Sequence, residues 1–335
     1  MEDNGALPQG GMMTQSAMNA ADIVVGVDGS DESFAALKFA LKEAAITGQK
    51  VNAVFGWTHS WDMGAEPDDD ESWSKVRREI SATLREWVEK ASTGIEFDPG
   101  NLELTSVKAT GTSALLQIGA NAQQIVVGRR SLGRVARWFM GSLSASLAEE
   151  SKRPVTVVRI LDDEAQNVQD AIANALTPVD AHVRVEAPQR AVSPDRRPVV
   201  VGVDGSETSA HALDFAIHEA ATHQRPLHVM FCWQLKDLGV IEGYENAIAP
   251  IEAGQRRAEE IVNGMVAKAT IPEGVVSVEA HAFHIPAAKG LISASRYASW
   301  LVVGSRGLSG LDAHFLGSVS KQIVNFAECT VTVVH

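Results

Sequence analysis

The sequence is dominated by an internal duplication with a constant offset of 176 residues. Gly26–Ser30 reads Gly-Val-Asp-Gly-Ser and recurs unchanged at Gly202–Ser206. Across residues 26–47 and their shifted counterparts, 13 of 22 positions are identical. Val155–Val158 recurs unchanged at Val331–Val334. Because one offset holds almost throughout, we expect two domains of the same fold, which also fits the length of 335 residues.

The duplication divides the chain into four segments. Residues 22–160 and 198–335 are the two domains, and residues 161–197 match neither copy, so we expect a linker there. Residues 1–21 are rich in Gly, Gln, Asn and Met and lack the basic and apolar regions of a signal peptide. We therefore expect residues 1–21 to be a disordered leader.

Charge and cysteine content exclude several classes of protein. Forty-two acidic against 29 basic residues give a net charge of −13, which argues against a nucleic-acid partner. The apolar runs are far shorter than the ~20 residues of a membrane span. Cys232 and Cys329 form neither a disulfide framework nor a zinc motif, which is typical of a reducing compartment. We expect a cytoplasmic protein that does not engage a membrane.

Strand and helix patterns alternate in each copy. Ile23–Asp28 is a β-branched run typical of a strand buried on both faces, and Ser30 is a candidate N-cap for the next helix. The same reasoning predicts further strands at 51–57, 102–109, 125–128 and 155–160, and further helices after 68–71 and at 113–121 and 142–150. Five strands alternating with four helices predict an α/β domain with a parallel, doubly wound sheet.

Two segments follow strand ends where such sheets bind ligands. One is the turn at 204–206, with its counterpart at 28–30. The other is the loop Gly304-Ser-Arg-Gly-Leu-Ser-Gly310, followed by Gly317-Ser318 at the start of a helix. Glycines let backbone N–H groups approach an anion, and a helix N-terminus and serine hydroxyls favour phosphate. Neither a P-loop nor a G-x-G-x-x-G motif follows the first strand.

These residues resemble the universal stress protein family in its tandem, two-domain form. The family's ATP-binding signature, G-x2-G-x9-G-[ST], is matched in full by Gly304, Gly307, Gly317 and Ser318. A strand that ends in Val-Asp-Gly-Ser, as the family's first strand does, occurs in both copies. The resemblance implies tandem Rossmann-like (adenine-nucleotide α-hydrolase-like) domains with strand order 3-2-1-4-5. It also implies ATP, with or without Mg²⁺, between strands 1 and 4.

The resemblance further implies roles for single residues. Asp204 would lie by the ribose and base, Val303 would line the adenine, and Cys232 falls where the family places a small apolar residue. Residues 304–317 would wrap the phosphates. The binding candidates of the second copy are Asp204, Gly205, Ser206, Cys232, Val303, Gly304, Arg306, Gly307, Gly310, Gly317, Ser318, Val319 and Ser320.

The first copy departs from the signature, because Ser131 replaces the second glycine and Arg134 stands opposite Gly310. If Gly307 needs a positive φ or close approach of phosphate, a serine there costs about 1 kcal/mol. Four arginines around this loop, at 129, 130, 134 and 137, offer side-chain contacts to phosphate instead. We expect the second copy to bind ATP and the first to bind it weakly or to hold a different anion. The candidates of the first copy are Asp28, Gly29, Ser30, Val127, Gly128, Arg130, Ser131, Gly141, Ser142 and Ser144.

Some of these residues also have a purely structural interpretation. Asp28 and Asp204 would also serve as caps of the turn before the first helix, and the arginines as surface or inter-domain residues. His281, His284 and His314 lack ligand spacing as a set, so no metal site is predicted.

No nucleophile and base pair is predicted near the second loop, so no catalytic residue is assigned. The leading hypothesis is an ATP-binding regulatory protein of the stress response. A nucleotide-independent dimerisation or scaffold protein and a slow ATPase or autophosphorylating enzyme remain alternatives. The last strand of each copy is an exposed sheet edge, and in the family this edge pairs two domains. We therefore expect an intramolecular pseudo-dimer, and a homodimer remains open.

Overall fold

The computed structural model describes residues 22–58, 69–129, 142–160, 197–307 and 316–335. In the first half it contains β1 (Ile23–Gly26), α1 (Asp31–Thr47), β2 (Val51–Trp57), α2 (Asp70–Ser92), η3 (Pro99–Asn101), β3 (Leu102–Lys108), α3 (Gly111–Ile118), η4 (Gly119–Asn121), β4 (Gln124–Gly128), α4 (Ser142–Glu150) and β5 (Val155–Val158). In the second half it contains β6 (Val199–Gly202), α6 (Glu207–Thr222), β7 (Leu227–Cys232), η6 (Leu235–Asp237), α7 (Ile251–Lys268), β8 (Val278–Phe283), α8 (Ala287–Ala294), β9 (Trp300–Gly304), α9 (Ser318–Phe326) and β10 (Thr330–Val334).

The strands form one ten-stranded sheet in the order β3-β2-β1-β4-β5-β10-β9-β6-β7-β8. Within each half the order is 3-2-1-4-5 and neighbouring strands are parallel, as expected from the sequence. The chain reverses its direction of winding between β1 and β4 and between β6 and β9. The carboxyl ends of these two strand pairs are therefore the switch points at which open sheets bind ligands.

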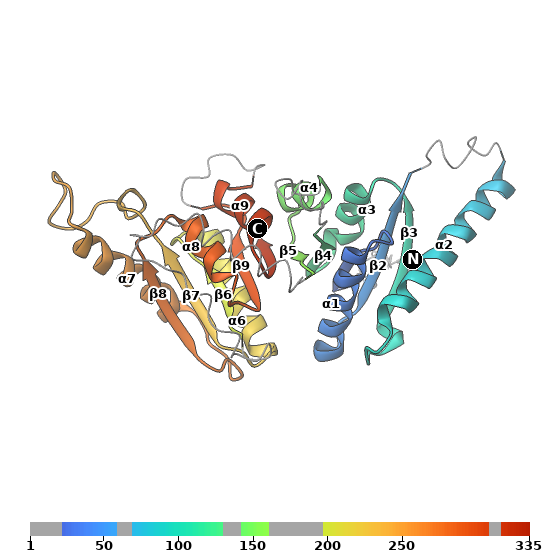
Figure 1. Ribbon diagram of the computed structural model, residues 1–335, viewed down its shortest axis with the longest axis horizontal. Coiled ribbons are helices and arrows are strands. Elements are labelled where there is room, and N and C mark those ends of the chain that lie inside the picture. The colour runs from blue at the N-terminus through green and yellow to red at the C-terminus, as the bar shows by residue number, and fades with distance from the viewer. Residues whose placement is uncertain (1–21, 59–68, 130–141, 161–196, 308–315) are drawn as a thin grey trace, which may run out of the picture.

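Helices cover both faces of each half, as Figure 1 shows. In the first half, α1 and α2 pack on one face around Leu37, Leu41 and Leu84. The other face, beneath α3 and α4, belongs to a core that continues into the second half beneath α8 and α9. Because one apolar core spans both halves, the two domains form a joined pair rather than separate bodies.

The junction is an antiparallel pairing of β5 with β10, at the middle of Figure 1. Thr156 lies opposite Thr332, its own counterpart at the 176-residue offset, and their hydroxyl oxygens are 2.6 Å apart. Gln124 donates to Thr156 Oγ1, and Trp300 Nε1 donates to Thr332 Oγ1 at 2.7 Å. A pseudo-twofold axis therefore passes between the two threonines, and each sheet edge is covered by the other half.

A buried charged cluster, formed by Glu43, Glu219 and His223, lies where α1 meets the end of α6. Glu43 and Glu219 are counterparts in the duplication, and His223 Nε2 lies 2.9 Å from Glu43 Oε2 and 3.7 Å from Glu219 Oε2. Burial lowers the pKa of His223, but its interactions with both carboxylates outweigh burial and raise the pKa to about 9. His223 is therefore a cation at neutral pH, and its charge offsets part of the negative charge of the two glutamates that the fold brings together.

Candidate functional site

The turn after β6 is held by its own side chains. Asp204 Oδ1 accepts a hydrogen bond from Ser206 N at 3.0 Å. Ser206 is the N-cap of α6, and its Oγ accepts from Ser209 N at 3.2 Å. Gly205 has a φ of 86°, in the left-handed region that favours glycine. One carboxylate oxygen of Asp204 thus has the turn-capping role that the sequence left open.

The turn after β1 repeats this geometry. Asp28 Oδ1 accepts from Ser30 N at 3.1 Å, Ser30 caps α1 by accepting from Ser33 N at 3.2 Å, and Gly29 has a φ of 84°. The two halves therefore present the same turn, as the identical Val-Asp-Gly-Ser segments predict. Any difference between the two sites must come from what surrounds the turn.

The loop that follows β9 lies against the turn that follows β6. A β-carbon at Gly307 would overlap Asp204 Oδ2, so these two residues are in close contact. The φ of Gly307 is outside the left-handed region, so a side chain here is disfavoured by contact with the Asp204 carboxylate, which would have to move, and not by backbone conformation. Gly304 also lies close to Thr208, because a β-carbon at Gly304 would be 3.0 Å from Thr208 Cγ2. The two segments singled out in the sequence therefore meet at the switch point.

Helix α9 begins beside this loop. Gly317 is its N-cap residue, and Gly317 N donates to Ser305 O at 2.8 Å. Ser318 is exposed in the first turn, where free N–H groups and the helix dipole favour an anion. Ser320 is only 4% exposed, and its Oγ donates to Gly304 O at 2.6 Å. The hydroxyl hydrogen of Ser320 thus fastens α9 to β9, which differs from the expected donation to phosphate.

The residues that were expected to line the adenine, Cys232 and Val303, lie at or next to the last residues of β7 and β9. Cys232 is 5% exposed, and its Sγ would lie 2.5 Å from a β-carbon at Gly290 of α8. Burial raises the pKa of the Cys232 thiol to about 12, so the thiol is neutral. Val303 is buried in the common core, and Val319 is partly buried against it. Arg306, which follows β9, is half-buried.

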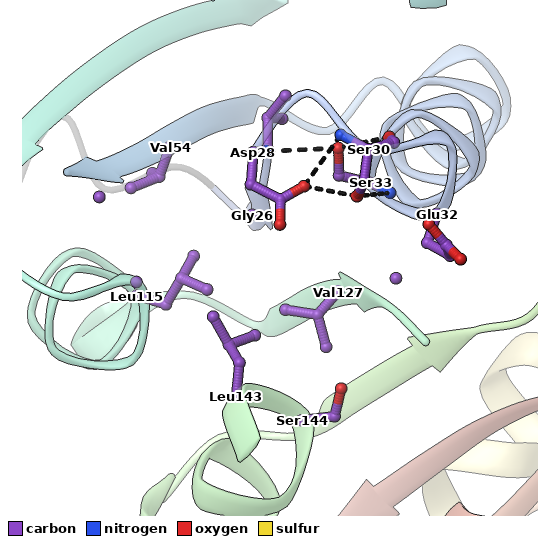
Figure 2. A pocket seen from close by; sticks show the side chains of 14 residues that line it. Gly26, Asp28, Ser30, Glu32, Ser33, Val54, Leu115, Val127, Leu143 and Ser144 are labelled. Atoms are coloured by element: carbon purple, nitrogen blue, oxygen red, sulfur yellow. Dashed lines mark hydrogen bonds between the residues drawn. The ribbon is translucent and has the colours of Figure 1, made fainter. Parts of the chain in front are cut away.

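A cavity of about 240 Å³ lies at the switch point of the first half (Figure 2). Asp28, Ser30 and Ser33 lie on one side of it, and Leu115 and Leu143 lie opposite. Its complete lining is Gly26, Val27, Asp28, Ser30, Glu32, Ser33, Val54, Gly56, Gly111, Leu115, Val127, Gly128, Leu143 and Ser144. A half-polar, half-apolar lining is typical of sites that hold an organic ligand with polar groups. The half whose loop departs from the signature therefore has an open cavity.

Two positions that the sequence did not single out distinguish the sites. Glu32 lines the cavity of the first half, and a β-carbon at Gly128 would overlap the backbone of Glu32. The counterpart of Glu32 is Thr208, so a carboxylate replaces a hydroxyl beside the first loop glycine. Gly56 also lines this cavity, whereas its counterpart is Cys232. Both differences could have been found in the sequence by comparing the two copies position by position at the 176-residue offset.

Of the four arginines around the first loop, the structure describes Arg129. Arg129 Nη1 donates to Ala327 O at 2.8 Å, and Arg159 Nη1 donates to the same carbonyl at 2.6 Å. Burial, followed by the charge of Arg159, lowers the pKa of Arg129 to about 10. Arg129 therefore has the inter-domain role left open by the sequence. Several candidates lie outside the described residues: Arg130, Ser131, Arg134, Arg137, Gly141 and Gly310. Ser142 begins α4.

The fold and site define tandem Rossmann-like domains that carry a glycine loop at the switch point. The family model of the universal stress protein family matches this chain twice, over residues 21–159 and 195–335. The chain is 28% identical over 316 residues to a universal stress protein of Mycobacterium tuberculosis, covering 93% of this chain and 96% of the relative. It is also 28% identical over 335 residues to a universal stress protein of Mycolicibacterium smegmatis, covering 96% and 99%.

Solved structures show the same fold. The crystal structure of a universal stress protein from Archaeoglobus fulgidus aligns with a TM-score of 0.56 at 18% identity, covering 94% of this chain and 98% of that one. This chain belongs to the universal stress protein family and carries two domains of that family in tandem. In the part of the chain that the structure describes, no helix has the length and apolar character needed to span a membrane.

Proposed function

We propose that this chain is a nucleotide-dependent regulatory protein of the stress response, acting in the cytoplasm, whose second domain binds ATP. In this proposal the domains are residues 22–160 and 198–335, joined by the linker 161–197 and preceded by the leader 1–21. The observation that carries the proposal is the contact between Gly307 and Asp204 Oδ2. It brings the glycine loop and the acidic turn to the switch point, where this class of sheet binds its ligands.

The phosphate groups are assigned to the loop and the start of α9. Residues 304–317 supply glycines that allow close backbone approach, and exposed Ser318 adds a hydroxyl at the helix N-terminus. Asp204 Oδ1 is engaged by the turn, so the ribose hydroxyls are assigned to the Oδ2 side of this carboxylate. ATP, with or without Mg²⁺, fits this division into a phosphate-binding loop and an acidic ribose-binding side.

The first domain is proposed to bind ATP more weakly or to hold a different anion. Its loop has Ser131 in place of the second glycine. Glu32 adds a negative charge beside Gly128, at the point where the phosphate loop begins. Like charges a few ångströms apart repel by about 4 kcal/mol near a protein surface before solvent screening. The two features act in the same direction, against a triphosphate.

A scaffold function is the second candidate, supported by the joined sheet and the common core of the two halves. If nucleotide plays no part, the chain would act through its assembled surface alone. Slow ATP hydrolysis or autophosphorylation would need a positioned nucleophile, and Ser318 is the exposed hydroxyl next to the proposed phosphate site.

The test identifies what the purified protein carries. The protein is isolated without added nucleotide and denatured, and the released ligand is identified by mass spectrometry before and after soaking in ATP. Gly307→Ser, which installs the residue of the first loop, is expected to weaken ATP binding at least about 10-fold, or roughly 1.4 kcal/mol, so that less ATP is released.

Gly264→Ser is the matched control, because no atom lies within 4 Å of a β-carbon at this position of α7. The control should release as much ATP as the unchanged protein. Absence of nucleotide from both the purified and the ATP-soaked protein would support the scaffold function instead.

A further inference from the structure

A histidine and glutamate cluster lies on the outer strands of the second half, away from the proposed nucleotide site. His228 is on β7, and Glu279 and His281 are on β8. The strand register places His228 opposite Glu279, and His281 opposite Met230, two residues further along β7. Side chains two residues apart on a strand share a face, so all three point to the same side of the sheet. Spacing along the sequence gave no such set, because His228 and His281 are 53 positions apart and are brought together by strand pairing.

The three side chains converge on one point. His281 Nε2 lies 3.3 Å from Glu279 Oε2, and His228 Nε2 lies 3.7 Å from the same oxygen. One ligand atom from each residue lies within 4.8 Å of the other two. The side chains are 21%, 52% and 35% exposed for His228, Glu279 and His281, so the point of convergence is open to solvent.

We propose that His228, Glu279 and His281 form a three-ligand site for a divalent transition-metal cation of the zinc class. Two imidazole nitrogens and one carboxylate oxygen are the donors that such cations prefer, at distances of about 2.0–2.2 Å. Ligands at those distances around one ion are about 3–4 Å apart, which is the separation of the carboxylate from each imidazole here. The exposed side leaves room for water or a further ligand.

The surroundings of His228 suit this role. The ring of His228 lies 5.9 Å from that of Tyr297 and 5.5 Å from that of His281, measured between ring centroids. His228 is therefore packed beside two neighbouring rings, with its Nε2 directed to the shared carboxylate oxygen of Glu279 at 3.7 Å.

The first half provides a natural comparison. At the 176-residue offset, the counterparts of His228, Glu279 and His281 are Asn52, Glu103 and Thr105. Only the carboxylate is retained there, so the proposed site belongs to the second half alone. Its ligands come from two adjacent strands, and β8 is the outermost strand of the sheet. A bound cation would therefore fasten this edge strand to β7.

The experiment uses the full chain, freed of nucleotide and metal by dialysis against a chelator. Zn²⁺ is titrated at pH 7.5 by isothermal calorimetry, and Co²⁺ binding is followed by its visible absorption. We expect one ion per chain. His228→Asn and His281→Thr, which install the first-half residues, should each raise the Kd at least about 10-fold, the lower limit even for residues that only support a ligand.

Two controls keep the result specific. His211→Asn, on the exposed side of α6, and His223→Thr, in the buried charged cluster, should leave the titration unchanged. A second readout is thermal unfolding, in which Zn²⁺ should raise the Tm of the unchanged chain and not that of the His228→Asn chain, because a ligand that binds only the folded state stabilises it. Absence of stoichiometric Zn²⁺ binding, or equal binding by the two first-half variants, would overturn the proposal.

Discussion

The two halves share one turn but differ in what surrounds it. Asp28–Ser30 and Asp204–Ser206 share the hydrogen bond from the serine N–H to the aspartate carboxylate and the left-handed glycine between them. The second half has the complete glycine loop, with Gly307 in contact with Asp204. The first half lacks that glycine but has an open cavity of about 240 Å³. The two switch points are therefore alike in their turns and differ in the residues around those turns.

The same comparison identifies the residues near the two turns that differ between the halves. In the second half, Cys232 takes the place of Gly56 and packs onto Gly290 of α8. In the first half, Glu32 stands where the second half has Thr208. Exchanging these residues between the halves tests the comparison, because the other half of the same chain shows each exchanged residue in its own surroundings.

The largest effect on stability is expected from Gly56→Cys. A β-carbon at Gly56 would lie 2.8 Å from Gly111 Cα and 3.0 Å from Ala114 Cβ, so the cysteine would push α3 away from β2. We expect the free energy of unfolding to fall by about 3 kcal/mol, as for overpacked cores. Urea titration followed by circular dichroism measures this loss.

The companion variant Gly56→Cys with Ala114→Gly should recover part of the loss. Gly290 is the counterpart of Ala114 and accommodates Cys232 in the second half. Wild-type stability in Gly56→Cys alone would show that the first cavity does not depend on close packing of these backbones.

A smaller effect, on affinity, is expected from Thr208→Glu. The change places a carboxylate beside Gly304, as Glu32 lies beside Gly128. Repulsion of the phosphates should weaken ATP binding to the second half about 10- to 100-fold, which corresponds to roughly 1.4–2.8 kcal/mol. Calorimetric titration with ATP measures it, and Thr208→Gln is the uncharged control of equal size. Equal affinities of the Glu and Gln variants would mean that charge at this position does not separate the halves.

The smallest effect concerns the junction between the halves. The pKa of His223 is raised to about 9, so its stabilising charge is fully present below about pH 6.5 and is lost as the pH rises through 9. Burial raises the pKa of Glu219. Ionisation of Glu219 as the pH rises therefore also lowers the free energy of unfolding. Between pH 6.5 and 9.5 the Tm should fall by roughly 3 °C more in the unchanged chain than in His223→Thr.

His211→Thr serves as the control in this series, since His211 is exposed on α6. It should keep the pH dependence of the unchanged chain. If His223→Thr and the unchanged chain lose the same Tm over this range, the buried charged cluster does not hold the junction.

Much of the fold was predictable because the duplication and the strand patterns are local or periodic signals. Ser30 caps α1 as predicted, and the five strands of the first half lie where β-branched runs predicted them. Some ends differ. The helix predicted at 113–121 is α3 at Gly111–Ile118 followed by a short 3-10 turn, and the strand predicted at 155–160 ends at Val158. Hydrogen bonds at element ends depend on tertiary neighbours, which sequence patterns do not contain.

The sites were less predictable, because contacts between distant segments decide them. The sequence indicated the importance of Gly307, but not that its neighbour is the Asp204 carboxylate. It left Arg129 open between a phosphate role and an inter-domain role, and the contact with the carbonyl of Ala327 gives Arg129 the inter-domain role. It gave Ser320 a phosphate role, whereas its hydroxyl donates to Gly304 O. In each case a backbone acceptor or a close approach created by the fold determines the role.

The most direct test of the central claim is calorimetric titration of the nucleotide-free chain with ATP. The account predicts two affinities that differ by at least about 10-fold, or roughly 1.4 kcal/mol, with the tighter phase removed by Gly307→Ser and kept in the Gly264→Ser control. Two equal affinities, or a tight phase that survives Gly307→Ser, would contradict the assignment of ATP to the second half.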